Sequence, residues 1–234
     1  MSAGNRTVVV TGAAGNLGKA VAAAFAAEGA NLVLVDVERG RLEQAFGAES
    51  DRRVFAPANL LEMSAATGVA QAALSRFGRI DALCNIAGGF RMGETVHETS
   101  DENWNFLFDI NTRTLLHAVR AVVPHMVSAG GGKIVNVGAF AAQKGAAQMG
   151  AYIASKATVI RMTEAMAGEL REKNINVNCV LPTIIDTPEN RAAMPKANPA
   201  KWVAPEDLAN VIVFLASDAA RAVHGAAVPV TGLS

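Results

Sequence analysis

Short apolar runs alternate with longer segments of helical periodicity along most of the chain. The runs are rich in Val and Ile and apolar on both faces, which is typical of buried parallel strands. We expect strands at Thr7–Val10, Asn31–Asp36, Arg53–Pro57, Ile80–Asn85, Lys133–Val137, Asn174–Val180 and Ala227–Val230. Helices are expected at Leu17–Glu28, Met63–Phe77, Asp101–His125, Gly150–Glu172 and Pro205–Ala216, with Pro124 ending or kinking the third.

Repeated strand–helix units predict the fold class. They favour an α/β protein with a doubly wound parallel sheet of about seven strands and helices on both faces. No linker or repeat divides the 234 residues, so we expect one domain spanning 1–234. The longest irregular stretch, Pro182–Ala204, holds four prolines. A connection of this length is usually functional, and residues 181–204 are predicted to form a substrate and cofactor lid.

Composition and charge narrow the function classes. The chain is 51% hydrophobic, with 21 basic and 21 acidic residues and no block of like charge, which argues against nucleic-acid and membrane partners. The two cysteines, Cys84 and Cys179, lie in apolar runs and are expected to be packed free thiols, and no metal site is predicted. The stretch Met1–Thr7 lacks an apolar signal segment, which favours a cytoplasmic protein.

A glycine-rich turn follows the first expected strand and precedes the first expected helix. It reads Thr11-Gly-Ala-Ala-Gly-Asn-Leu-Gly18. Glycines allow a backbone to approach a pyrophosphate closely, and a helix N-terminus offers free N–H groups to it. The alternative is a tight strand–helix connection that binds nothing, but the position in the chain favours a Rossmann-type dinucleotide site. The residues predicted to contact the cofactor here are Gly12, Gly15, Asn16, Leu17 and Gly18.

The cofactor is predicted to be NAD(H) rather than NADP(H). Asp36 ends the second strand, where a carboxylate accepts hydrogen bonds from ribose hydroxyls and repels a 2′-phosphate. Val37 follows it, and Arg39 and Arg41 are expected to face solvent. The residues after the fourth strand are small, and Asn85, Ala87 and Gly88 are predicted to form a wall of the cofactor site.

Tyr152 and Lys156 stand four apart, on one face of an expected helix. A phenol is a weak acid near neutrality, and a neighbouring ammonium lowers its pKa. Tyr152 is therefore predicted to donate a proton as hydride reaches the substrate, with Lys156 tuning it and holding the nicotinamide ribose. Asn111 is predicted to hold a water that links Lys156 to solvent. A Tyr-x-x-x-Lys pair in an arbitrary sequence is usually an exposed surface pair, but Tyr152 is the single tyrosine and falls where this fold needs it.

The glycine turn, Asn85-Ile-Ala-Gly88, Asn111 and Tyr152-x-x-x-Lys156 together resemble the short-chain dehydrogenase/reductase family across nearly the whole chain. The resemblance implies an NAD(P)-dependent oxidoreductase that forms a homodimer or homotetramer on its long helices. It implies that the segment from Pro182 closes over the nicotinamide. The further contacts that it implies are Ile185 and Thr187 at the carboxamide and Asn59 and Leu60 at the adenine.

One expected residue of that family is missing. Thirteen residues before the tyrosine, where most members carry a Ser that bonds the substrate oxygen, this chain has Ala139. Gln143 and Gln148 are the only side-chain amides between Gly138 and Tyr152, and they read equally well as exposed loop residues. Three explanations are open. The substrate needs no such donor, or the enzyme is impaired, or the chain is a non-catalytic NAD(H)-binding protein.

The second half resembles one branch of the family, the quinonoid dihydropteridine reductases. The residues that carry it are Ala87-Gly-Gly-Phe90, the pair Gly138-Ala139, and the run Val180-Leu-Pro-Thr-Ile-Ile-Asp-Thr-Pro-Glu-Asn-Arg191 with Met194 and Trp202. This branch also lacks the Ser and uses NADH. The leading hypothesis is hydride transfer to a small conjugated or carbonyl substrate, with a quinonoid dihydropterin as first candidate. The alternatives are a general alcohol/ketone dehydrogenase and a nucleotide-binding scaffold.

Overall fold

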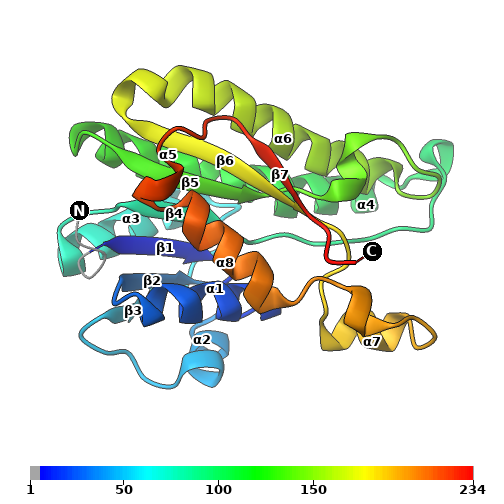
Figure 1. Cartoon of the computed structure of the whole chain (residues 1–234), viewed down its shortest axis with the longest axis horizontal. Helices are drawn as coiled ribbons and strands as arrows, with labels where there is room; N and C mark the ends of the chain where they lie inside the picture. Colours follow the sequence, from blue (N-terminus) through cyan, green and yellow to red (C-terminus); the bar gives the residue numbers. More distant parts are fainter. Residues whose placement is uncertain (1–5, 234) are drawn as a thin grey trace.

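A parallel sheet forms the centre of the molecule, and helices pack on both of its faces (Figure 1). The computed structural model describes residues 6–233, so most of the polar amino-terminal stretch lies outside the described residues. Within them the sheet has seven strands in the order β3-β2-β1-β4-β5-β6-β7, and each neighbouring pair is parallel. The strands are β1 (Thr7–Thr11), β2 (Asn31–Val35), β3 (Arg53–Phe55), β4 (Ala82–Asn85), β5 (Gly132–Val137), β6 (Ile175–Pro182) and β7 (Ala227–Val230). The predicted fold class is confirmed.

Two apolar cores lie on the two faces of this sheet. The helices are α1 (Asn16–Ala27), α2 (Arg39–Phe46), α3 (Met63–Phe77), α4 (Asp101–Phe108), α5 (Thr114–Ser128), α6 (Gly150–Leu170), α7 (Pro188–Ala193) and α8 (Pro205–Leu215). One core joins the strands to α1 and α8, and the other joins them to α3, α5 and α6. Because both faces are covered, the central strands are apolar throughout, which is the pattern seen in the sequence.

The predicted helix Asp101–His125 is interrupted. A π-helical turn at Asp109–Arg113 separates α4 from α5 and carries Asn111. Such turns are single insertions that often occur at functional sites. Pro124 does not end α5, which continues to Ser128. The proline lies in the last turn and a half, so its missing N–H removes one intrahelical bond near an end that frays in any case.

Two short helices were absent from the sequence-based expectation. Only Leu42 is buried in α2, so the apolar periodicity that would reveal this helix is weak. The stretch Pro182–Ala204, expected to be irregular, contains α7, whose first turn is capped by the Thr187 hydroxyl. The two ends of the stretch Pro182–Ala204 also meet, because Asp186 N donates to Val203 O at 2.8 Å.

Strand register brings the carboxyl ends together at one edge of the sheet. Thr11 of β1 pairs with Val35 on one side and with Asn85 on the other, and Asn85 pairs with Asn136 of β5. The strand order reverses between β1 and β4, where a crevice opens outside the carboxyl ends. The fold therefore places the loops that carry the predicted site residues next to one another.

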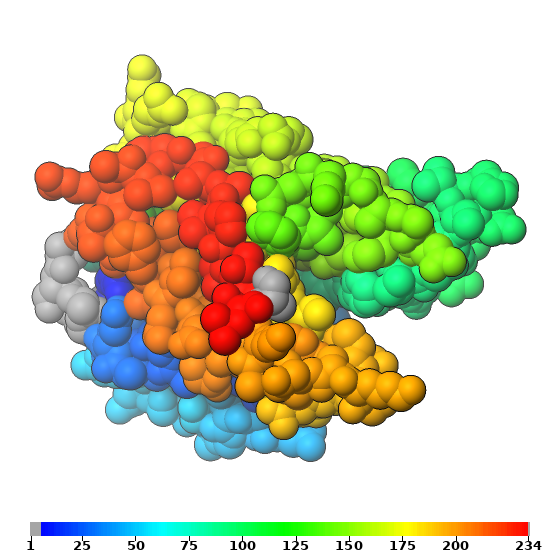
Figure 2. All heavy atoms as spheres, turned by 45° about the vertical axis from the view of Figure 1, so that its right-hand side comes forward, coloured from blue at the N-terminus to red at the C-terminus, as the bar shows by residue number. Residues whose placement is uncertain are grey.

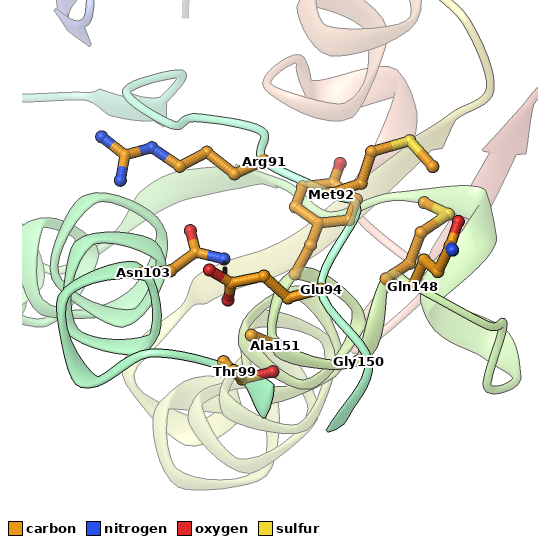
Figure 3. Close-up of a pocket in the computed structure, with 10 residues that line it drawn as sticks. Arg91, Met92, Glu94, Thr99, Asn103, Gln148, Gly150 and Ala151 are labelled. Carbon is orange, nitrogen blue, oxygen red and sulfur yellow. Dashed lines mark hydrogen bonds between the residues drawn. The ribbon is translucent and has the colours of Figure 1, made fainter. Parts of the chain in front are cut away.

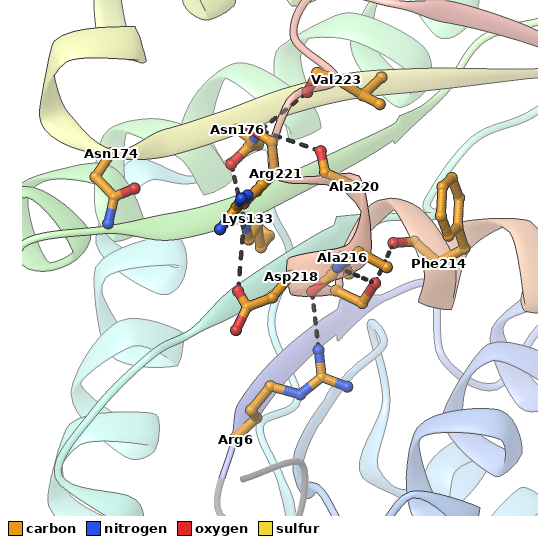
Figure 4. Close-up of polar contacts among 12 residues, drawn as sticks. Arg6, Lys133, Asn174, Asn176, Phe214, Ala216, Asp218, Ala220, Arg221 and Val223 are labelled. Atoms are coloured by element: carbon orange, nitrogen blue, oxygen red, sulfur yellow. Dashed lines mark hydrogen bonds and ion pairs between the residues drawn. The ribbon is translucent and has the colours of Figure 1, made fainter. Parts of the chain in front are cut away.

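The opposite edge of the sheet is held by polar contacts around Asn176 (Figure 4). Its side-chain amide donates to Arg221 O and Val223 O at 2.9 Å, and its oxygen accepts from Lys133 Nζ at 2.7 Å. Burial lowers the pKa of Lys133, and Asp218 at 3.8 Å opposes that shift. These bonds fix the segment between α8 and β7, and they lie away from the predicted site.

Two helical glycines allow a matched test of backbone packing. A Cβ at Gly18 would lie 2.2 Å from Gly12 O, whereas a Cβ at Gly68 meets nothing within 4 Å. We expect Gly18→Ala to lower the free energy of unfolding by about 2 kcal/mol or more, because fixed backbone must move. Gly68→Ala should raise it by about 0.5–1 kcal/mol through helix propensity. Urea denaturation measures both, and equal effects of the two substitutions would contradict this account.

Candidate active site

The glycine turn packs directly against the loop that follows β4. Gly12 has φ +62°, and a Cβ there would lie 2.9 Å from Ala87 Cα. The Thr11 hydroxyl accepts hydrogen bonds from Ile86 N at 3.0 Å and Ala87 N at 3.1 Å. Only glycine fits between the two loops, and the threonine holds them in register. A narrow backbone cradle results at the point where the strand order reverses.

Helix α1 begins at Asn16, inside this cradle. The first-turn N–H groups of a helix have no intrahelical partner, so Asn16, Leu17 and Gly18 present donors and a favourable dipole to an anion. The Asn16 side chain does not point into a cofactor contact of its own, since its amide donates to Glu189 Oε2 of α7 at 2.8 Å. That bond ties the glycine turn to the segment predicted to be a lid.

Asp36 lies just beyond the end of β2 and is 7% exposed. Its carboxylate accepts from Ala14 N at 3.1 Å and from Val37 N at 3.0 Å, and it pairs with Arg41 Nη1 at 2.8 Å. The expectation that Arg41 simply faces solvent is wrong, because α2 turns this half-exposed side chain back onto the acid. Arg39 is also half exposed, but it pairs with Glu43 and Glu49 instead.

The residues predicted to flank an adenine lie beside Asp36. Ala58 N donates to Asp36 O at 2.9 Å, which brings the next residues alongside the end of β2. Asn59 is exposed and its Oδ1 accepts from Leu61 N, so its amide remains at the surface. Leu60 is 6% exposed and packs in the core. Its carbonyl oxygen is 2.8 Å from His117 Nδ1.

The wall after β4 reaches the catalytic helix. A Cβ at Gly88 would lie 3.1 Å from Lys156 Nζ and 3.0 Å from Asn111 Oδ1, so a side chain here would collide with both. Asn85 is buried and turns inward, donating to Asn136 Oδ1 at 2.8 Å. Its own Oδ1 has no hydrogen-bond partner among the described residues. Asn85 therefore stiffens the strand ends, while Ala87 and Gly88 form the wall itself.

Lys156 and Tyr152 occupy the first two turns of α6. The Lys156 ammonium is 5% exposed and donates to Val137 O at the end of β5, at 2.8 Å. Burial lowers the pKa of Lys156 to about 8, and the Cys179 thiol acts in the opposite direction. Burial raises the pKa of Tyr152 to about 12, and the Phe90 ring meets the tyrosine edge-on at 4.8 Å. Tyr152 is thus held as a protonated phenol, and its tuning by Lys156 stays a prediction.

Asn111 joins three parts of the site through its side chain. Its Oδ1 accepts from Gly89 N at 2.9 Å, and its Nδ2 donates to Gly89 O and to Ser155 Oγ, both at 3.0 Å. Ser155 directly precedes Lys156 in the chain and is fully buried. The π-helical turn is what directs Asn111 inward. Its observed role is to lock the wall after β4 against α6.

A small, shallow pocket opens beside Tyr152, lined by the loop after β4, by α4 and by the start of α6. Arg91, Glu94 and Asn103 lie on one side of it, and Met92 and Gln148 lie on the other (Figure 3). Glu94 accepts from Asn103 Nδ2 at 2.9 Å and Ser100 N at 3.1 Å, and these bonds lower its pKa.

Three apolar side chains lie close to Tyr152. Met92 and Met149 line the pocket, and the Phe90 ring contacts Tyr152. Trp202 is 8% exposed and does not line this pocket. Arg191 forms a two-bond ion pair with Asp186 at 2.6 and 2.7 Å, within the segment 181–204.

The segment that contains α7 and the pocket lie on opposite sides of an open cleft. In Figure 2 this orange segment and the green segments that carry the pocket stand apart, with the carboxyl end of β6 between them. Pro182 ends β6 and is buried. Ile185 O accepts from Asn190 Nδ2 at 2.8 Å, while the Thr187 hydroxyl accepts from Asn190 N and bonds the Glu189 carboxylate.

Several site residues had no distinct sequence signal. Arg41, Glu94 and Glu189 are ordinary surface residue types, and only the fold brings them to Asp36, to the pocket and to the glycine turn. Phe90 belongs to the run that carries the resemblance, but its contact with Tyr152 could not be read from spacing. Among residues 6–233 no group of His, Cys, Asp and Glu could hold a metal ion, and both cysteines are buried and free. In the same range no helix combines the length and hydropathy that a membrane span requires.

Comparison with known proteins agrees with this geometry. The short chain dehydrogenase family model matches residues 6–198. The BbsD subunit of (2S)-[(R)-hydroxy(phenyl)methyl]succinyl-CoA dehydrogenase from Thauera aromatica is 34% identical, over 97% of this chain and 96% of its own length.

Solved structures give the same result. Carveol dehydrogenase from Mycobacterium avium, in complex with NAD, superimposes with a TM-score of 0.89 at 28% identity, covering 99% of this chain and 98% of that one. L-sorbose reductase from Gluconobacter frateurii, complexed with NADPH and L-sorbose, gives 0.87 at 29% identity, again covering 99% and 98%. The chain belongs to the short-chain dehydrogenase/reductase family.

Proposed function

We propose that the protein is an NAD(H)-dependent oxidoreductase that moves hydride between nicotinamide and a small conjugated or carbonyl substrate. The observation that carries the proposal is the convergence of Tyr152, Lys156 and Asn111 on the crevice where the strand order reverses. Tyr152 is a half-buried, protonated phenol at the pocket, and Lys156 is a buried amine one helical turn away in α6. Burying an amine costs free energy, so a buried lysine beside this tyrosine points to a functional role.

The glycine turn suits a dinucleotide. A Cβ at Gly12 would lie 2.9 Å from Ala87 Cα and one at Gly18 would lie 2.2 Å from Gly12 O, so both glycines let the turn pack closely, and the first turn of α1 offers free N–H groups beside it. Asp36 offers a carboxylate at the distance along β2 where a ribose is expected. When bound, NAD(H) supplies or accepts the hydride. Ala87 and Gly88 give a flat wall of small residues.

The residues of this chain manage the proton. As a substrate C=O or C=N bond gains hydride at carbon, its heteroatom gains negative charge and takes the proton from Tyr152 Oη. The Lys156 ammonium lies next to Gly88, since a Cβ at that glycine would be 3.1 Å from Lys156 Nζ. Its positive charge favours the Tyr152 phenolate that remains after the proton has been transferred. Asn111 and Ser155 keep Lys156 on its helix turn. The reverse reaction uses the same groups with the proton returning to the phenolate.

Ala139 directs the choice of substrate. It is 4% exposed at the end of β5, and no hydroxyl replaces it between residues 138 and 151. A polarised C=N system needs less stabilisation of oxygen charge than a ketone does, so a quinonoid dihydropterin remains the first candidate. The second candidate is a ketone or secondary alcohol, which the 34% identity to a hydroxyacyl-CoA dehydrogenase subunit favours.

We also propose that the chain assembles as a homodimer or homotetramer through α4, α5 and α6. Trp104, Phe106 and Leu116 on the first two of these helices are 36–45% exposed. The Trp104 ring also stacks on Phe108 at 4.4 Å, which presents a broad aromatic surface. Apolar patches of this kind mark protein interfaces in soluble folds.

NAD(H) preference rests on Asp36, since relatives of known structure hold either cofactor. Asp36→Ala removes the carboxylate that repels a 2′-phosphate and releases Arg41 to bind one. We expect the ratio of kcat/KM for NADPH over NADH to rise about tenfold or more, as for one charge-assisted bond. Combining Asp36→Ala with Arg41→Ala should remove this gain. An unchanged ratio in the single variant would refute the assignment.

Lys156 should make NADH binding depend on pH. Because its pKa is about 8, the ammonium that attracts the dinucleotide is present below that pH and is lost above it. The Kd for NADH, measured by fluorescence, should therefore increase as pH rises from about 7 to about 9. Lys156→Met should bind NADH more weakly and without this pH dependence. A wild-type Kd that stays constant over the range would contradict the prediction.

Tyr152 and Ala139 separate the candidate functions. Tyr152→Phe should lower kcat by about 10²-fold or more, because the proton donor is lost while the fold is kept. Ala139→Ser should raise turnover of a 3-oxoacyl ester by about tenfold or more and change quinonoid dihydropterin turnover little. NADH oxidation at 340 nm reports both. A strong gain with the ketone and no pterin turnover would eliminate the pterin candidate, and NADH binding without any turnover would favour a binding protein.

A further inference from the structure

Gln148 has an unusual backbone conformation at the edge of the pocket. Its φ is +61°, and Asn174 is the only other non-glycine residue with positive φ among residues 6–233. Asn174 ends a 3₁₀ turn, and its side-chain amide donates to Gly130 O. These local contacts explain its positive φ. A left-handed glutamine is costly and persists only where the surroundings enforce it. Gln148 is therefore placed by its neighbours and not by its own preference.

The loop that follows β4 holds the backbone of Gln148. Gly93 N donates to Gln148 O at 2.8 Å, which joins the loop after β4 to the loop that leads into α6. With its backbone fixed in this way, Gln148 lines the pocket together with Tyr152 and Met149. It lies across the pocket from Glu94 and Asn103 (Figure 3).

The side-chain amide of Gln148 is unengaged. It is exposed, and no hydrogen bond within the described part of the chain involves it. The other amide of this loop behaves differently, because Gln143 Nε2 donates back to Phe140 O at 3.3 Å and Gln143 does not line the pocket. One of the two amides is thus free at the reaction centre, in a chain that lacks the hydroxyl at position 139.

We propose that the Gln148 side-chain amide is the second donor to the substrate heteroatom, in place of the hydroxyl that Ala139 lacks. This rests on the proposed oxidoreductase function. The amide N–H accepts no proton and breaks no bond. It stabilises the negative charge that develops on the oxygen or nitrogen of the substrate, while Tyr152 Oη transfers its proton to that atom and NADH supplies the hydride. A neutral donor on a loop also suits an uncharged conjugated ring.

Three variants test the proposal on the full-length protein, with NADH and either quinonoid dihydropterin or a 3-oxoacyl ester as substrate. Gln148→Gly removes the amide and suits the positive φ, so its Tm should equal or exceed that of the wild type. Its kcat should nevertheless fall about tenfold or more, with an unchanged Kd for NADH. Gln143→Ala, the matched control, should keep wild-type kcat and Kd.

Gln148→Glu gives a readout that a structural role would not produce. A carboxylate cannot donate to a negative centre, so kcat should be low at neutral pH. It should recover relative to wild type as pH falls toward the ordinary Glu pKa of about 4.3, because the protonated carboxyl donates. Absence of that relative recovery would mean that position 148 acts through packing.

The outcomes separate this inference from the proposed function. If Tyr152→Phe abolishes turnover while Gln148→Gly stays within twofold of wild type, the function stands and the role of Gln148 is overturned. If Tyr152→Phe has no effect on turnover, or if the wild type oxidises NADH with neither substrate, the proposed function fails and this inference fails with it.

Discussion

Parallel hydrogen bonding between β1, β4 and β5 sets the position of everything in the site. Thr11, Asn85 and Asn136 pair in one row, so the chain leaves the three strands at the same level of the sheet. In the sequence, the glycine turn comes after Thr11, the wall of small residues comes after Asn85, and Ala139 comes three residues after Asn136. The turn and the wall then approach so closely that a Cβ at Gly12 would overlap Ala87. A shift of one strand by a single residue would separate these groups, because successive side chains point to opposite faces.

Burial determines the ionisation of the two residues proposed to carry the chemistry, Tyr152 and Lys156. Lys156 is enclosed between α6 and β5 with one backbone carbonyl as acceptor, and its pKa falls to about 8. Tyr152 is enclosed beneath Phe90, and its pKa rises to about 12. Desolvation disfavours the charged form of each, so it moves the two pKa values in opposite directions. In the function proposed above, this gives a neutral proton donor beside an amine whose charge depends on pH near neutrality.

The cleft is built from two walls that are stabilised separately. On one side Glu94 holds the loop after β4 to the start of α4, and Gly93 holds it to Gln148. On the other side Glu189 ties the lid helix to Asn16 of the glycine turn. This second bond links the position of the lid to the turn that would receive a pyrophosphate.

The sequence by itself determined the strands, the glycine turn, Asp36 and the pair Tyr152–Lys156. These depend on period, spacing and residue type within short segments, and local physics is sufficient to read them. It missed α2, whose single buried residue leaves little periodicity, and it joined α4 to α5 because a π-helical turn keeps the helical pattern. Only the tertiary structure decided that Arg41 pairs with Asp36, that Asn111 locks Gly89 to Ser155, and that Gln148 is left-handed. Each of these depends on contacts between segments that no local pattern relates, so they appear only once the sheet has brought those segments together.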